Sequence, residues 1–122
     1  ERMMLNEQVF ANALLLAGEV TEQQSRILEV LCNASTSSLK MRLRDGLTPD
    51  DCKADFIASA SLMALAALAG VSGDVPVEQI TAGDFTIRKG TISYDAASNC
   101  LRNQAELMMA SYLKDNFSFR GV

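Results

Sequence analysis

A long apolar segment in the middle of the chain, residues 56–71, constrains the fold more than any other feature. Only Ser59 and Ser61 interrupt it before Gly70, and alanine recurs along it at positions 58, 60, 64, 66, 67 and 69. A helix that is apolar on nearly every side has to be covered by neighbours on several sides. The segment is also shorter than the roughly 20 residues that cross a bilayer. We therefore predict a central core helix and no membrane contact.

The start of this central helix is marked by the residues just before it. Thr48 is a good N-cap residue and Pro49 suits the first helical position. Asp50 and Asp51 follow, where carboxylates complement the positive end of the helix dipole. These signals predict a helix over residues 49–69. Three glycines stand after apolar-periodic segments, where left-handed helix termini are expected, and so imply three helices in the first half: Gly18, Gly46 and Gly70.

Two shorter amphipathic patterns precede the central helix. Residues 5–17 predict a helix whose buried side is made of Val9, Phe10, Ala13, Leu14 and Ala17. A second helix begins at Thr21, whose hydroxyl can cap free amide groups while Gln24 reaches back to form a capping box. It is predicted to run to about Asp45, with a buried stripe made of Ile27, Val30, Leu31, Ala34 and Met41. Residues 35–38, Ser-Thr-Ser-Ser, interrupt that stripe and predict either a bend or packing against a small-residue surface.

The pattern changes from helical to strand-like after residue 70. Residues 85–94 alternate apolar and polar positions with a period of two, which is typical of strands. Phe85 and Ile87 share one side, and Ile92 and Tyr94 can match them across a reversal. The segment Arg88-Lys89-Gly90 is predicted to form that reversal, because its glycine can adopt a positive φ. The sequence therefore predicts a β-hairpin.

A last helix closes the predicted fold. It runs from about Asp95, a suitable N-cap, to Lys114, with an apolar face made of Ala97, Cys100, Leu101, Ala105, Met108 and Tyr112. A chain of 122 residues is expected to form a single domain, residues 1–122. The predicted fold class is mainly α: a four-helix bundle-like domain with a small β-hairpin inserted before the last helix. Residues 1–20 hold an additional amino-terminal helix, and residues 116–122 form a C-terminal tail.

The composition offers little for catalysis. Histidine, the commonest general base and metal ligand, is absent. Cys32, Cys52 and Cys100 lie far apart without a Cys-x-x-Cys unit, which favours buried free thiols over disulfides. The glycines at 70 and 73 follow a helix and lack the lysine of a phosphate-binding loop. We therefore expect no enzyme activity, no catalytic residue, no metal site and no cofactor.

The charge balance argues against tight binding of nucleic acid. The chain carries 11 basic and 15 acidic residues, for a net charge of -4. Lys40, Arg42 and Arg44 lie near the end of the second helix, where they can offset its negative dipole end. A phosphate contact is the alternative role for these three residues.

Two groups of residues are candidates for contacts with other chains. A two-stranded hairpin is marginally stable in water, so it must pack on the helices or pair with another chain. The hairpin candidates are Phe85, Ile87, Arg88, Lys89, Ile92 and Tyr94. The C-terminal tail adds aromatic residues at a position that either folds back or binds a partner: Phe117, Phe119 and Arg120.

The order of elements resembles the small head–tail connector (neck) proteins of long-tailed bacteriophages and prophages. The resemblance rests on helices, then a β segment with the sequence Ile80-Thr81-Ala82-Gly83-Asp84-Phe85-Thr86-Ile87, then a closing helix and a tail. The resemblance covers about residues 21–122. The helix ahead of Thr21 departs from the family's arrangement, so the resemblance does not define an interface at the amino terminus. The resemblance implies a structural virion protein: a ring of about a dozen copies between portal and tail, through which DNA passes as cargo.

The resemblance also implies partners and a location. The β segment would contact a neighbouring subunit or a tail-completion protein, and the tail would dock to the portal. The protein would lie at the head–tail junction of the virion, or in the bacterial cytoplasm during assembly, and can be a monomer in isolation. The alternative is a small cytosolic regulatory or adaptor domain without catalytic activity, dimeric through the first or the central helix. A third is a DNA-packaging or transcription accessory protein that uses Lys40, Arg42 and Arg44.

Overall fold

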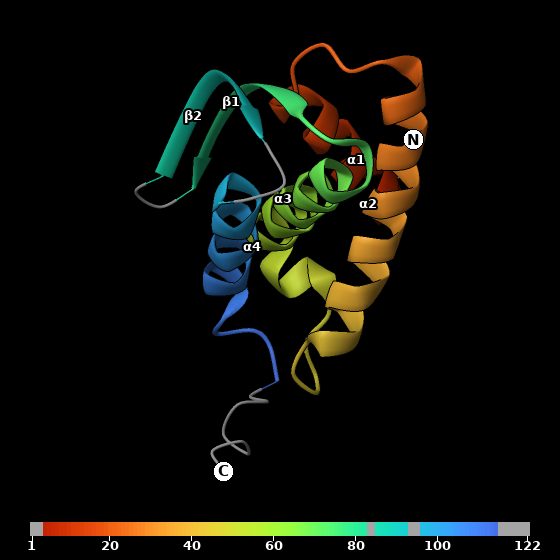
Figure 1. The fold of residues 1–122 in the computed structure, drawn as a ribbon. Helices are drawn as coiled ribbons and strands as arrows, with labels where there is room; N and C mark the ends of the chain where they lie inside the picture. Colours follow the sequence, from red (N-terminus) through yellow and green to blue (C-terminus); the bar gives the residue numbers. More distant parts are fainter. Residues whose placement is uncertain (1–3, 83–84, 93–95, 115–122) are drawn as a thin grey trace.

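The chain folds into four α-helices and one β-hairpin, as seen in a computed structural model that describes residues 4–82, 85–92 and 96–114. The helices are α1 (Leu5–Leu16), α2 (Glu22–Arg42), the 3-10 helix η1 (Pro49–Cys52), α3 (Lys53–Ser72) and α4 (Ala96–Met109). The strands β1 (Val75–Ala82) and β2 (Phe85–Ile92) form an antiparallel pair before α4 (Figure 1). The predicted fold class, mainly α with a small hairpin before the last helix, is confirmed.

Helix α3 is the centre of the molecule. It contacts α1, α2, α4 and both strands, and Figure 1 shows it lying between α2 and α4. Phe56, Leu65 and Leu68 on this helix are fully buried. Residues Pro49–Ser72 are the one stretch within the described residues long and apolar enough to cross a membrane by length and composition. Most apolar side chains of this stretch are buried against the rest of the chain, so the stretch forms the core of the fold.

The two serines that interrupt the apolar segment join α3 to its neighbours. The Ser61 hydroxyl lies 3.2 Å from the carbonyl oxygen of Val9 and accepts a hydrogen bond from the Asn12 amide at 3.0 Å. The Ser59 hydroxyl donates to the carbonyl oxygen of Ala105, 3.3 Å away on α4. Because buried hydroxyls need partners, these bonds specify where α1 and α4 cross the central helix.

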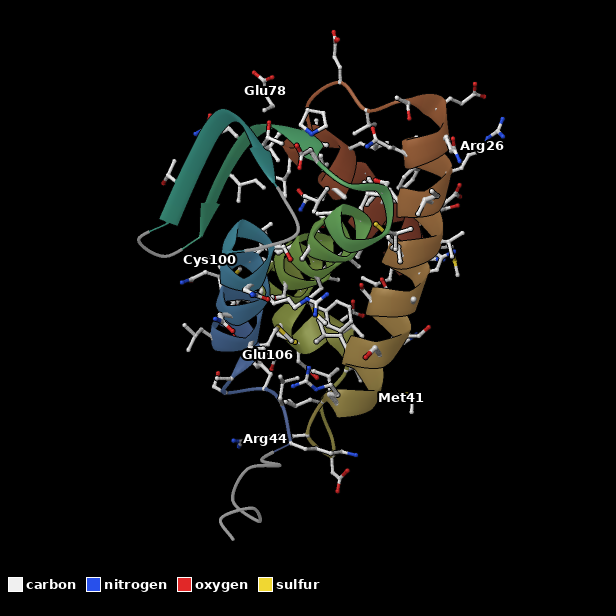
Figure 2. All side chains as sticks on the ribbon, in the orientation of Figure 1. Arg26, Met41, Arg44, Glu78, Cys100 and Glu106 are labelled. Carbon is white, nitrogen blue, oxygen red and sulfur yellow. The ribbon has the colours of Figure 1, made fainter. Side chains whose placement is uncertain are left out.

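Helix α2 begins as predicted but buries a different face. Thr21 and Gln24 form the expected capping box, and the helix ends at Arg42 rather than near Asp45. Its buried residues are Leu28, Cys32, Thr36 and Leu39. The predicted stripe is only partly right: Ile27 and Leu31 are partly buried against the core, whereas Val30 is 64% exposed and Met41 76% exposed. Figure 2 shows Met41 on the outer side of the helix. Contact with both α1 and α3 decides the buried side, because apolar residues lie on two sides of this helix.

The glycines end helices less regularly than predicted. Gly46, after α2, has a φ of 89°, but α3 continues through Gly70 and ends at Gly73, whose φ is 85°. Gly18 serves a close approach instead: its amide donates to the carbonyl oxygen of Pro76 at 2.8 Å. A Cβ on Gly18 would lie 3.2 Å from the Pro76 Cβ. The missing side chain thus lets the chain after α1 run beside β1, where Ala17 bridges Val77.

The hairpin has longer strands and a different turn from those predicted. Its register pairs Val75 with Ile92, Ile80 with Ile87 and Ala82 with Phe85. The predicted reversal at Arg88-Lys89-Gly90 is wrong, because these residues lie inside β2 and Gly90 pairs with Val77. Two eight-residue strands pair far more backbone groups than two four-residue strands around residue 90 could, which favours the observed register.

The last helix is shorter than predicted. Helix α4 ends at Met109, and the chain then turns so that Leu113 bridges Leu43 beside the end of α2. Its buried side consists of Ser98, Leu101, Ala105 and Met109. Cys100, predicted to be buried, is exposed, whereas Cys32 and Cys52 are buried as expected. The predicted N-cap Asp95 lies outside the described residues.

Candidate functional site

The described residues hold no concentration of reactive groups. Residues 4–82, 85–92 and 96–114 contain no group of three or more His, Cys, Asp or Glu that could hold a metal ion. Burial, with a smaller contribution from Glu29, raises the pKa of the Cys32 thiol to about 12. Burial also raises the pKa of Cys52. Both thiols therefore stay protonated near neutral pH and act as core residues.

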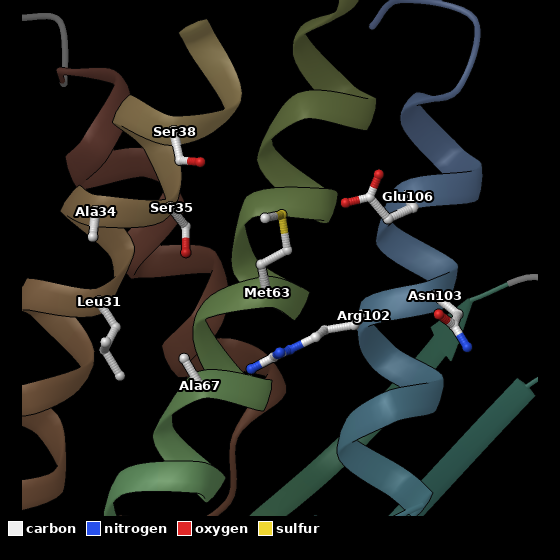
Figure 3. Close-up of a pocket in the computed structure, with 9 residues that line it drawn as sticks. All are labelled: Leu31, Ala34, Ser35, Ser38, Met63, Ala67, Arg102, Asn103 and Glu106. Atoms are coloured by element: carbon white, nitrogen blue, oxygen red, sulfur yellow. The ribbon is translucent and has the colours of Figure 1, made fainter. Parts of the chain in front are cut away.

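A groove of about 500 Å³ crosses the outer surface of α3 between α2 and α4 (Figure 3). Its lining residues are Leu31, Ala34, Ser35, Ser38, Met63, Ala67, Arg102, Asn103 and Glu106. Figure 3 shows the Arg102 side chain reaching from α4 toward Ala67 on the floor. The groove exists because α3 presents the small Ala67 and the half-buried Met63 where the flanking helices do not meet.

An ion pair joins the two walls of this groove. The Arg42 guanidinium on α2 makes two hydrogen bonds to the Glu106 carboxylate on α4, at 2.7 and 2.6 Å. The hydrogen bonds from Arg42 hold the pKa of Glu106 below its ordinary value. The side chains of Arg42 and Glu106 remain 32% and 48% exposed, so water screens much of their attraction. The pair orients two helices that otherwise pack mainly on α3.

Replacing Glu106 by glutamine should lower the free energy of unfolding by about 0.5 kcal/mol at neutral pH. Because the folded-state pKa is depressed, the pair stabilises the protein above the pKa of the unfolded carboxyl and loses that effect as pH falls through the folded pKa. Urea unfolding at about pH 7 and about pH 3 should therefore show a difference between wild type and variant that shrinks at the lower pH. Glu22→Gln, in the far more exposed pair with Arg26, is the control. An equal difference at both pH values would contradict the prediction.

Two basic residues at the end of α2 connect it to α4 and to the segment that follows α4. Arg42 pairs with Glu106, and the Arg44 Nε donates to the carbonyl oxygen of Leu113 at 3.1 Å. The backbone amide of Arg44 also donates to Tyr112, at 2.9 Å. Lys40 is exposed. Two of the three residues considered for phosphate contact thus have structural partners, which leaves the nucleic-acid hypothesis with less support.

The predicted hairpin residues fall on one strand. Phe85, Ile87, Arg88, Lys89 and Ile92 all belong to β2, so Arg88 and Lys89 stand within a strand and not at the tip. In the described residues β2 pairs only with β1, whose own first half is bridged to Ala17. The hairpin extends beyond the helices in Figure 1. Its outer strand is therefore an edge strand of the two-stranded sheet, the kind of position at which another strand can add.

The remaining predicted site residues lie outside the described residues: Tyr94, Phe117, Phe119 and Arg120. A surface that the sequence reasoning missed lies on α2, where Val30 and Met41 are exposed. The signal for it was present, because residues 30–39 carry no charge although the helix lies at the surface. An uncharged stretch on a surface helix indicates an exposed face as well as a buried stripe, and here Val30 and Met41 form the exposed face.

Comparisons with protein-family models, with curated proteins and with solved structures found no match for this chain.

Proposed function

We propose that this protein is a structural assembly subunit of the head–tail connector kind, which forms a ring between portal and tail through which DNA passes. The observation that supports it best is the projecting hairpin, whose strand β2 pairs only with β1 within the described residues. An edge strand of eight residues is a ready site for pairing with a neighbouring chain. Repeated head to tail, such a contact closes into a ring when the rotation between copies closes.

The support of the hairpin favours this use. One end of β1 is held by the bridge between Ala17 and Val77 and by the bond from Gly18 to Pro76. The buried Val75, Val77 and Ile80 anchor β1 on the body. A hairpin fixed along its inner strand presents its outer strand in one orientation, and a fixed orientation is what a closed ring needs.

Sedimentation velocity over a wide concentration range, with electron microscopy of the largest species, tests the proposal. Closed rings of about a dozen copies are the expected result, alone or on a purified portal assembly. A dimer as the largest species under both conditions would refute the ring, and the adaptor alternative further requires that this dimer form through α1 or α3. That alternative now has fewer surfaces, because the central helix is covered on several sides along most of its length, whereas α1 exposes Leu15 at 77%.

Replacing Phe85 and Ile87 together by serine should abolish ring assembly while lowering thermal stability only slightly. Serine removes two apolar side chains from the edge strand that is proposed to meet the neighbour. The check is sedimentation velocity together with a thermal melt followed by circular dichroism. Gln79→Ser, at an exposed position of the inner strand, is the matched control and should leave assembly intact. Global unfolding of the double variant would place both side chains in the core and defeat the docking role.

A further inference from the structure

The outer side of α2 is an uncharged surface that no other described element covers. Val30, Ala34, Ser37 and Met41 follow one another at spacings of four, three and four, so they share one side of the helix. All four are exposed, Val30 at 64% and Met41 at 76%. Figure 2 shows Met41 on the side of α2 that faces away from α3. These four residues are called the α2 outer face below.

Two opposite charges flank this face on the same side. Glu29 and Lys40 are eleven residues apart, which is close to three helical turns, and both are exposed. Neither side chain makes an ion pair or a hydrogen bond with another residue in the described ranges. Other charged residues on the same helix do have partners, since Arg26 pairs with Glu22 and Arg42 with Glu106. Glu29 and Lys40 are therefore available for a partner outside the chain.

We propose that the α2 outer face binds the same face of a second copy, with the two helices antiparallel. In this arrangement Val30 of one copy lies against Met41 of the partner subunit, and Ala34 lies against Ser37 of the partner subunit. Glu29 then lies about two residues, or roughly 3 Å, along the axis from Lys40 of the partner subunit. A lysine side chain spans that offset, and the two-fold symmetry forms the ion pair twice.

The charges select a second copy and this direction. A parallel pair would place the Glu29 and Lys40 flanks of the two copies on opposite edges of the interface, where they cannot form ion pairs with each other. Ala34 and Ser37 at the middle allow the two helix axes to approach closely, because interaxial distance follows the size of the side chains at the contact. Val30 and Met41 at the ends then bury the largest exposed apolar groups of the helix. The surface is complementary to itself.

This contact does not depend on the proposed ring. An isologous contact closes at two copies, whereas a ring needs a head-to-tail contact such as the one proposed for β2. Where the ring contact is absent, the protein is a dimer, so the two proposals fail separately.

Charge reversal at the flanking residues tests the proposal. The parent for this test carries Phe85→Ser and Ile87→Ser, which are expected to remove ring assembly. Sedimentation velocity from about 1 to 100 µM then measures the dissociation constant of its dimer. In that background Glu29→Lys and Lys40→Glu should each raise the dissociation constant about tenfold, because each reversal replaces two attractive pairs by two repulsive ones. The double reversal Glu29→Lys with Lys40→Glu should restore it to within about threefold.

Glu19→Lys is the matched control, since it makes the same charge change at an exposed position outside α2 and should leave dimerisation unchanged. A chain that stays monomeric to 100 µM, single reversals that dimerise like the parent, or a double reversal that stays weak would each overturn the proposal. Circular dichroism melts of the variants confirm folding, which these exposed substitutions should preserve. If the parent background itself fails to fold, the same series is measured in the wild-type chain.

Discussion

Replacing Phe56 by alanine should lower the free energy of unfolding by about 3–5 kcal/mol. Phe56 is fully buried near the start of α3 and is the largest side chain of the core. Its removal loses the transfer free energy of the ring and leaves a cavity that the helices around α3 cannot fill without moving. Because a domain of this size is stabilised by only about 5–15 kcal/mol, the variant should unfold at a much lower urea concentration.

Leu107→Ala is the control for this substitution. Leu107 is 67% exposed on α4, so its truncation removes little contact and should change the free energy of unfolding by less than about 0.5 kcal/mol. Urea unfolding of the two variants beside the wild type gives the comparison. A cost for Phe56→Ala below about 1.5 kcal/mol would show that the core is not built around this residue.

Enlarging Ala64 to leucine should destabilise the protein by about 1–3 kcal/mol, whereas the same change at Ala67 should be nearly neutral. Both residues lie on α3 one turn apart, and alanine and leucine have similar helix propensities, so propensity cancels in the comparison. Ala64 is fully buried and has no space for three more carbon atoms. Ala67 lies on the floor of the groove of about 500 Å³, which can accept them.

Thermal and urea unfolding of the two variants measure this difference. Equal destabilisation at both positions would show that the groove is closed in solution. Equal tolerance would show that α2 and α4 can separate from α3 at little cost, and that the alanines of α3 do not determine how closely its neighbours pack. The pair of variants therefore tests the central packing argument by a single change of volume in two surroundings.

The sequence predicted elements whose signals are local. The capping box at Thr21 and the N-cap signals at Thr48 need only a few neighbouring residues, and both mark helix starts in the structure. The apolar segment of residues 56–71 predicted a covered helix because no other environment suits it. The hairpin was expected from its two-residue alternation, although the strands pair in another register.

The candidate site was predicted less completely. Five of the predicted hairpin residues do lie in β2. The predicted reversal is wrong, because the chain reverses between Ala82 and Phe85 and not at Arg88-Lys89-Gly90. Gly90 led to the prediction of a turn because glycine is common in hairpin turns. In the structure the longer pairing of β1 with β2 is more favourable than a turn at Gly90. The groove and the α2 outer face were missed, since each depends on which sides of α2, α3 and α4 meet.

The sequence by itself determined that this chain is mainly helical, that its centre is the alanine-rich segment, and that a hairpin precedes the last helix. These outcomes follow from local hydrogen bonding and from the need to cover apolar surface. Only the tertiary structure decided which side of α2 is buried, because apolar residues lie on two of its sides and contacts with α1 and α3 select one. The same contacts leave Val30 and Met41 at the surface and set the ends of α2 and α4 beside each other through Arg42, Arg44 and Leu113. Such choices depend on the free energy of the whole packed core, which no short window of sequence contains.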